Sequence, residues 1–186
     1  MIMCEPCSRC RWANDKEGIL RAYHDHEWGV PSHDDAHLYE LLILESFQAG
    51  LSWAIVLKKR EAFREALDGF DCAKIAAYDE TKLNELMSNP RLIRNRRKFN
   101  AMIANSHVFL QIQAEYGSFD AYIWSFTKGQ VIKNTDDQIP VTSPLSDMIS
   151  KDLIRRGMKF MGSITVYSYL GAIGIIDDHE LNCFKY

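Results

Sequence analysis

Apolar residues recur at helical spacing along most of the chain, and turn-forming residues divide this pattern into separate segments. Leu38, Leu41 and Leu42 are spaced three and four residues apart, which places them on one face of a helix. Gly50 stands where a left-handed residue would end this helix. A second helix is expected to open at Ser52 and to run to Gly69.

Candidate capping residues mark further helices in the middle of the chain. Asp71 and Asp79 are each placed to cap a short helix, and Pro90 ends the second of them. A long helix is predicted from about residue 91 to 116. Ser118 is then placed to cap the next short apolar segment. This alternation of caps and periodic segments predicts a helical protein.

The C-terminal third contains one irregular segment followed by two more predicted helices. Residues 127–142 have no helical period, and we expect them to form a loop or a short hairpin. Ser143 followed by Pro144 is typical of a helix start, and this helix should end at Gly157. Another apolar helix is expected over 163–174. The pattern as a whole predicts an all-α fold.

Composition excludes several classes of protein. The chain has 186 residues, of which 25% are charged and 47% hydrophobic, as in an ordinary folded domain. Its 10 glycines and 5 prolines are too few for a loop-dominated or all-β chain. The longest uncharged stretch, residues 160–176, is shorter than the ~20 apolar residues that span a bilayer. We therefore expect no membrane span, no secretory signal and a cytoplasmic location.

Charge is unevenly distributed, although the formal net charge is only −3. A net charge of this sign gives no overall attraction to nucleic acid. Five basic residues nevertheless fall within eight positions, namely Arg91, Arg94, Arg96, Arg97 and Lys98. The cluster is a candidate DNA-binding surface, or alternatively a solvated helix face.

A short turn bounded by Gly157 and Gly162 joins the last two predicted helices. Glycines let a backbone approach a phosphate, and the free N–H groups that start a helix bind anions. Lys159 lies within the turn, and Arg155 and Arg156 lie beside it. This arrangement resembles a helix-hairpin-helix element that binds DNA. The alternative is a plain helical hairpin with solvated basic residues.

Cysteine and histidine residues near the two ends could hold a metal ion. His179 and Cys183 are four residues apart, so one helical turn would direct both at one ion. Cys10 and His24 could complete a tetrahedral zinc site, although Cys7 is an alternative to Cys10. Without zinc, His179 would be a surface residue and Cys183 a small hydrophobic one.

Glu45 interrupts the apolar stripe of its own helix. A carboxylate in that position needs a partner or a ligand. Trp53 follows shortly after, and an acid beside an aromatic plane suits a flat cationic ligand. Alternatively, Glu45 is a core acid satisfied by the protein itself. Tyr23 and nearby tryptophans add aromatic groups that could form either a pocket or core.

Six motifs, taken together and in order, resemble those of the 3-methyladenine DNA glycosylase I family. The match extends from Cys10 to Cys183. Its motifs are Cys10-Arg-Trp12, Tyr23-His-Asp-His-Glu-Trp-Gly-Val-Pro31, Leu44-Glu-Ser-Phe-Gln-Ala-Gly-Leu-Ser-Trp53, Leu57-Lys-Lys-Arg60, Arg156-Gly-Met-Lys-Phe-Met-Gly162 and Asp178-His-Glu-Leu-Asn-Cys183.

The resemblance implies a role for each matching residue. It implies a base pocket in which Glu45 is the catalytic residue and the substrate-binding residues are Tyr23, Trp53, Trp12 and Trp28. It implies one structural zinc on Cys10, His24, His179 and Cys183, which selects Cys10 over Cys7. It also implies DNA contacts at the tip Gly50-Leu51 and at the turn of Gly157, Lys159 and Gly162.

The sequence therefore predicts an all-α helix-hairpin-helix glycosylase occupying residues 1–186 as one domain. Within it, the helical hairpin covers about 143–174, and a zinc lobe is formed from about 1–33 and 175–186. The expected activity is hydrolysis of the N-glycosidic bond of 3-methyladenine in alkylated double-stranded DNA by a monomer, releasing free base. The alternative is a non-catalytic, zinc-containing DNA-binding module. A zinc hydrolase is disfavoured because four protein ligands close the metal site.

Overall fold

The computed structural model describes residues 8–136 and 138–186, and the fold is almost entirely helical. The helices are, in chain order, α1 (Ile19–His26), α2 (Asp35–Gln48), α3 (Trp53–Ala66), α4 (Cys72–Ala76), α5 (Glu80–Ser88), α6 (Arg96–Tyr116), α7 (Phe119–Ser125), α8 (Pro144–Arg156) and α9 (Ser163–Ala172). Short elements complete the fold: η1 (Arg11–Ala13), η2 (Asp68–Phe70), β1 (Ile132–Lys133) and β2 (Ile176–Asp177). The all-α prediction is confirmed.

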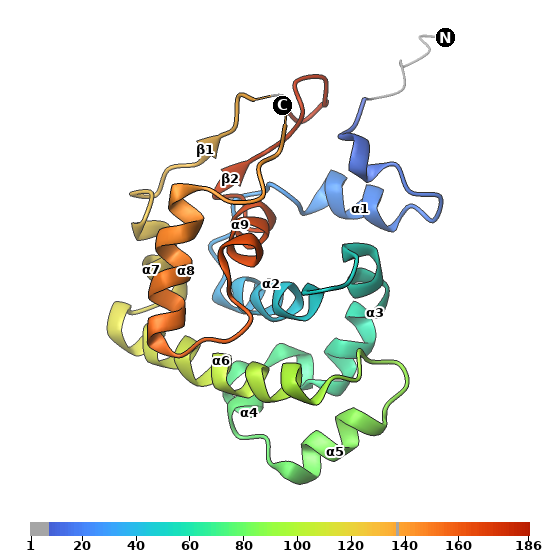
Figure 1. Ribbon diagram of the computed structural model, residues 1–186, viewed down its shortest axis with the longest axis vertical. Helices are drawn as coiled ribbons and strands as arrows, with labels where there is room; N and C mark the ends of the chain where they lie inside the picture. The colour runs from blue at the N-terminus through green and yellow to red at the C-terminus, as the bar shows by residue number, and fades with distance from the viewer. Residues whose placement is uncertain (1–7, 137) are drawn as a thin grey trace.

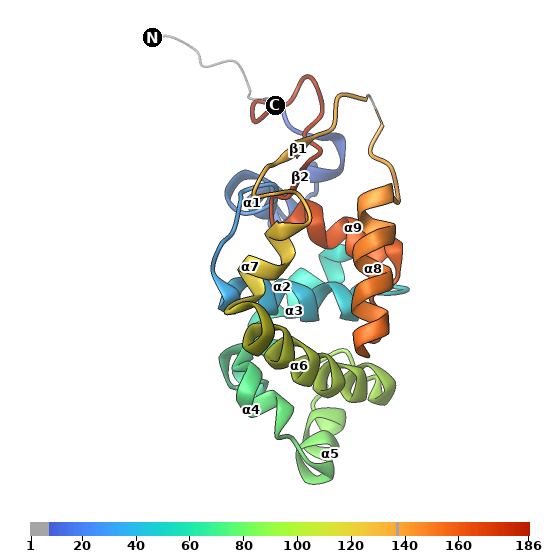
Figure 2. The ribbon, with the colours of Figure 1, turned by 90° about the vertical axis from the view of Figure 1, so that its left-hand side faces the viewer.

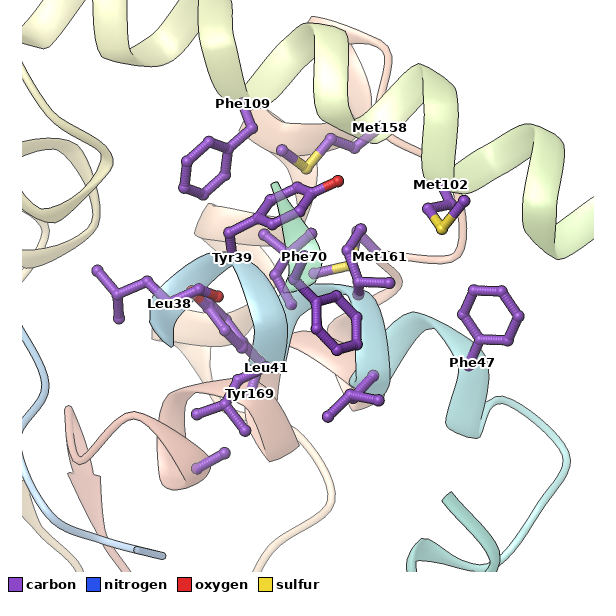
Figure 3. Close-up of a cluster of buried hydrophobic side chains, with 14 of the residues drawn as sticks. Leu38, Tyr39, Leu41, Phe47, Phe70, Met102, Phe109, Met158, Met161 and Tyr169 are labelled. Atoms are coloured by element: carbon purple, nitrogen blue, oxygen red, sulfur yellow. The ribbon is translucent and has the colours of Figure 1, made fainter. Parts of the chain in front are cut away.

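Helix α2 lies at the centre of the molecule, and helices α3, α6, α7 and α9 pack around it (Figure 1). Every residue from Leu38 to Phe47 is buried, so α2 is enclosed on all sides rather than along one stripe. Tyr39 of α2 meets Phe109 of α6 with ring centroids 5.0 Å apart (Figure 3). Apolar burial on this scale fixes α2, and with it Glu45, against the rest of the core.

Local capping determines where most helices begin, as the sequence predicts. The side chains of Asp71, Asp79, Ser118 and Ser143 each accept a hydrogen bond from a backbone N–H in the first turn of the helix that follows. The long helix is the exception, because it begins at Arg96 rather than near residue 91. Asn95 caps it by accepting from the Lys98 N–H, and this cap fixes the later start.

The segment 127–142 does not form the hairpin that was one of its two expected structures. Its β1 pairs instead with β2 in a parallel ladder, with Ile132 opposite Ile176. The Ile132 N–H donates to the Ile175 carbonyl at 2.8 Å, and the Asn134 N–H donates to the Asp177 carbonyl at 2.8 Å. The ladder therefore ties this loop to the C-terminal segment.

Helices α8 and α9 pack against each other across the predicted turn. Gly157 ends α8 with φ of 111°, a left-handed conformation that favours glycine. Met158 and Met161 are both 1% exposed and reach into the core (Figure 3). These two side chains anchor the turn and leave the residues between them at the surface.

The N-terminal and C-terminal segments lie side by side at one end of the molecule (Figures 1 and 2). The Phe184 N–H donates to the Ser8 carbonyl at 2.9 Å, and the Arg11 N–H donates to Glu180 Oε1 at 3.1 Å. We call residues 8–33 and 175–186 the terminal lobe, and residues 34–174 the helical body. Over the described ranges, no helix is both long and apolar enough to cross a membrane.

Candidate functional site

A cavity of about 440 Å³ lies between the terminal lobe and the helical body. All five residues that the sequence predicts for a pocket line it: Trp12, Tyr23, Trp28, Glu45 and Trp53. Three come from the lobe and two from the body. We call this space the aromatic cavity. The structure thus brings together side chains that are separated by up to 41 positions in the chain.

The aromatic rings form adjoining walls rather than a closed stack. The ring centroids of Tyr23 and Trp53 are 5.5 Å apart at 59°, and those of Trp12 and Trp28 are 4.9 Å apart at 80°. Trp53 is the first residue of α3, immediately after the turn that leaves α2. Tilted and edge-on contacts of this kind are favourable between the rings and leave ring faces available to a flat ligand.

Two buried polar atoms at the cavity have no hydrogen-bond partner among residues 8–136 and 138–186. One is Oε2 of Glu45, whose side chain is 3% exposed, and the other is Nε1 of Trp53. Burial raises the pKa of Glu45 to about 8 because the protein supplies no compensating charge. An unpaired acceptor and an unpaired donor in one aromatic cavity call for a planar ligand with complementary polar groups.

The cavity also contains residues that sequence reasoning did not place there. Asp178 lines it, and the Tyr167 hydroxyl donates to Asp178 Oδ1 at 3.0 Å. Burial raises the pKa of Asp178 above its ordinary value. Residues 139–141 contribute an apolar rim from the irregular loop. Neither group has a local sequence signal, because the β1–β2 ladder and α9 bring them to the cavity.

The terminal lobe holds a buried group of candidate metal ligands. The ligand atoms of Cys10, His24 and Cys183 all lie within 4.8 Å of one another, and this group could hold a metal ion. The Cys183 Sγ is 3.3 Å from His24 Nε2. Burial raises the pKa of the Cys10 thiol to about 12, so a thiolate there needs a positive charge that the surrounding protein does not supply.

His24 and His179 each have an aspartate beside the Nδ1 atom of the ring. Nδ1 of His24 is 2.9 Å from Asp25 Oδ1, and Nδ1 of His179 is 2.7 Å from Asp177 Oδ1. An aspartate on one ring nitrogen is the usual companion of a histidine that ligates a metal through the other. Nε2 of His179 is buried without a partner, although His179 is not in the close group of three. The imidazole rings of His24 and His179 lie 5.3 Å apart, centroid to centroid.

Gly29 makes room for the His179 ring. A Cβ at this position would lie 2.5 Å from an atom of the imidazole, and its φ of 74° also disfavours other residues. The glycine of the second motif is thus explained by packing against a candidate metal ligand. A larger residue here would push His179 away from its present place.

An ion-pair network joins the terminal lobe to the helical body. Arg60 of α3 donates from Nη1 to Glu27 Oε2 at 2.6 Å and from Nε to Glu40 Oε1 at 2.5 Å. Glu27 follows α1, whereas Glu40 lies in α2. The fourth motif therefore has a structural role, because it holds α1 against the body beside the aromatic cavity.

Three of the five basic residues at 91–98 are engaged by other groups of the protein. Arg91 pairs with Glu65, and Arg96 pairs with Glu80. Lys98 is 5% exposed, and its Nζ donates to the Phe47 and Ala49 carbonyls at 2.7 Å each. Because it caps the end of α2, Lys98 supports the turn to α3 rather than binding solvent or DNA.

The predicted DNA-contact residues lie at the surface in two places. Gly50 and Leu51 are exposed in the turn between α2 and α3, where Gly50 has φ of 80°. Lys159 is exposed in the turn between α8 and α9, flanked by Gly157 and Gly162. Both turns are fixed from within, the first by Lys98 and the second by buried methionines.

The fold matches that of a solved DNA glycosylase. A crystal structure of 3-methyladenine DNA glycosylase I superposes with a TM-score of 0.91 at 40% identity, covering 95% of this chain and 98% of that one. A variant of 3-methyladenine DNA glycosylase I, solved in complex with 3-methyladenine, matches with a TM-score of 0.89 at 36% identity, covering 95% and 96%.

Sequence comparison assigns the family. DNA-3-methyladenine glycosylase 1 of Escherichia coli strain K12 is 40% identical over 181 residues, which is 96% of each chain. The chain belongs to the methyladenine glycosylase family, whose model matches residues 12–186. The family resemblance predicted from the six motifs is confirmed.

Proposed function

We propose that this protein is a monofunctional DNA glycosylase that removes 3-methyladenine from alkylated duplex DNA. The observation that carries the proposal is the pair of unsatisfied buried atoms, Glu45 Oε2 and Trp53 Nε1, in one aromatic cavity. A flipped purine has both a flat face for the rings and polar edges for these atoms. The relative named DNA-3-methyladenine glycosylase 1 supports the assignment, and so does the similar structure solved with 3-methyladenine.

Charge is the basis of selectivity in this proposal. Methylation at N3 makes the adenine of a nucleotide cationic, and a cation is attracted to aromatic faces such as that of Trp53. With a pKa of about 8, Glu45 is largely protonated at neutral pH in the empty cavity. A cationic base lowers that pKa and draws out the carboxylate form, so binding releases a proton. Normal adenine has no such charge and gains less.

The lesion supplies much of the driving force for the chemical step. Water adds its oxygen to C1′ while the bond from C1′ to the base breaks, and the bonding electrons neutralise the cationic base. One proton of the water passes to solvent. The products are free 3-methyladenine and an abasic site. No lysine is among the described residues that line the cavity, which fits hydrolysis by water rather than by an amine nucleophile.

DNA is held, in this proposal, by the two exposed turns. The Gly50-Leu51 tip enters the gap that the flipped nucleotide leaves in the duplex, since Leu51 is 37% exposed and apolar. Gly157, Lys159 and Gly162 bind the phosphate backbone. We expect the protein to act as a monomer in the cytoplasm, because one chain contains both turns and the cavity.

Zinc has a structural part in this proposal. Cys10, His24, His179 and Cys183 would hold one ion, and their donor set of two thiolates and two imidazoles is one that zinc favours. The buried, partnerless Nε2 of His179 fits this assignment. The ion would provide the positive charge that stabilises the buried thiolates. Four protein ligands leave no position for substrate, so zinc would support the lobe that carries Trp12, Tyr23 and Trp28.

The decisive experiment incubates the protein with methylated duplex DNA and identifies the bases released. We expect 3-methyladenine from the parent protein and a loss of at least 100-fold in rate for Glu45→Gln. Asp147→Asn is the matched control, because it removes a carboxylate at the start of α8, outside the cavity. Binding of duplex without release of any base would contradict the proposal and favour a non-catalytic DNA-binding module.

A further inference from the structure

A second hollow lies on the surface formed by α6 and the turn between α8 and α9. It has a volume of about 560 Å³. Its lining consists of Arg97, Asn100, Ala101, Ala104, Lys159 and Phe160. The four α6 residues recur at helical spacing, so they form one face of that helix. We call this feature the α6–turn hollow.

The turn side of the hollow is held rigidly by a buried side chain. Asn105 of α6 is fully buried, and its Oδ1 accepts from the Lys159 N–H at 2.7 Å. Its Nδ2 donates to the Lys159 carbonyl at 3.0 Å. Both backbone groups of Lys159 are thereby fixed to α6. The next residue, Phe160, has φ of 56°, a conformation uncommon for a non-glycine residue.

The charge of the hollow is positive and uncompensated. Within the described part of the chain, no carboxylate lines the hollow. Arg91, Arg96 and Lys98, which share the basic cluster with Arg97, are all engaged by other protein groups. Among the described residues, Arg97 and Lys159 have no ion-pair partner, and both are exposed. Asn100 adds a neutral hydrogen-bonding group to the lining, where Ala101 and Ala104 have small side chains.

We propose that the α6–turn hollow binds one backbone phosphate of the DNA duplex, with Arg97 and Lys159 both contacting it. The inference rests on the proposed function, which makes duplex DNA the ligand. It adds Arg97 of α6 to the proposed DNA contacts. Arginine and lysine placed on opposite sides of an open, acid-free hollow suit a phosphodiester group. The hairpin turn and the basic cluster thus meet at one site through Arg97.

Titration of an abasic duplex at several salt concentrations tests this inference. We expect Arg97→Gln and Lys159→Gln each to weaken binding about tenfold. Because the two residues share one phosphate, the double variant should weaken binding by clearly less than the product of the two single effects. The slope of log affinity against log salt should fall by about one unit in total.

Arg94→Gln is the matched control. Arg94 is exposed and lies in the same basic cluster, but it is outside the hollow. The Arg94→Gln variant should bind the duplex with the affinity of the parent protein. Circular dichroism of each variant, together with its metal content, checks that the fold is retained.

Two results would overturn the inference. One is parental affinity of Arg97→Gln, and the other is full additivity with a slope loss of about two units, which would mean two separate phosphates. Base release by the parent is measured in parallel. If the parent releases base but Arg97→Gln binds normally, only the hollow is wrong. If the parent releases no base but both variants weaken duplex binding as expected, only the proposed function is wrong.

Discussion

The helical body and the terminal lobe are stabilised in different ways. The body encloses α2 in an apolar core, with Leu38, Leu41 and Phe47 fully buried. The lobe has little regular structure, and much of what it buries is polar, including His24 and His179. Burial of apolar surface is enough to fold the first region. The second brings imidazoles and thiols together, an arrangement that a bound metal ion would stabilise.

The aromatic cavity lies at the boundary of these two regions and depends on both. Glu45 and Trp53 come from the body, whereas Trp12, Tyr23 and Trp28 come from the lobe. A perturbation of either region should therefore reach the cavity, but through different physical effects. Four predictions separate those effects.

Metal removal should have the largest effect and should be confined to the lobe. Elemental analysis should find one zinc per chain. His179→Ala should lose it, because structural zinc contributes on the order of 10 kcal/mol of binding free energy to the folded state. Near-ultraviolet circular dichroism of the tryptophans should change, while the far-ultraviolet helical signal remains.

Cysteine variants give the controls for this prediction. Cys72→Ser should keep the metal, because Cys72 lies at the start of α4, far along the chain from the candidate ligands. Cys10→Ser should lose it and Cys7→Ser should retain it, although Cys7 lies outside the described residues. Metal-free protein purified without chelator would contradict the prediction.

A cavity in the core should destabilise the body without affecting the metal. Phe109 is 1% exposed and stacks on Phe119 with ring centroids 4.2 Å apart. Phe109→Ala should lower the free energy of unfolding by about 3–5 kcal/mol. Urea unfolding measures this loss, and zinc content should stay at the parental level. Loss of zinc in parallel would mean that the two regions are not separable.

Glu45 should make the stability of the body depend on pH. Burial raises its pKa from about 4.5 to about 8, so the folded state holds its proton more tightly than the unfolded state does. The stability that protonated Glu45 contributes is therefore fully present below pH 4.5, and it is lost as the pH rises through about 8. Glu45→Gln should remove this dependence, and its free energy of unfolding at pH 7 should exceed that of the parent by roughly 3 kcal/mol.

Urea unfolding at pH 5, 7 and 9 is the corresponding measurement. The Gln48→Glu variant adds a carboxylate to another residue of the cavity lining and should leave the dependence of the parent in place. Identical pH profiles for parent and Glu45→Gln would show that Glu45 is ionised in the empty cavity.

The smallest effect is expected at the support of the α2–α3 turn. Lys98→Met removes both hydrogen bonds to the end of α2, which should cost about 1–3 kcal/mol because the Phe47 and Ala49 carbonyls lose their donor. Base release from duplex should fall, whereas binding of free 3-methyladenine should not change. Arg94→Met, an exposed neighbour, should match the parent in both assays.

Features set by neighbouring residues could be predicted from the sequence. Asp71, Asp79 and Ser143 cap helices because each needs only a backbone N–H two or three residues ahead. The β1–β2 ladder could not be predicted, since Ile132 pairs with Ile176 across two intervening helices. The role of Lys98 could not be predicted for the same reason: its partners, Phe47 in α2 and Ala49 just after it, lie about fifty residues earlier in the chain.

The site was more predictable than the loops around it. A carboxylate within an apolar run and a histidine four residues before a cysteine are local signals, and the order of the motifs indicated the family. Asp178 and Tyr167 gave no such signal as a pair. Their contact depends on how α9 and β2 fold back against each other, and that packing is not encoded in either segment alone.

The burial of the thiols affects how readily methylating reagents can modify the protein. Reagents that methylate DNA are electrophiles, and they attack cysteine thiolates as well as bases. Cys10 is fully buried and Cys183 is 6% exposed. Burial thus shields both sulfur atoms of the terminal lobe from the small molecules that create the proposed substrate.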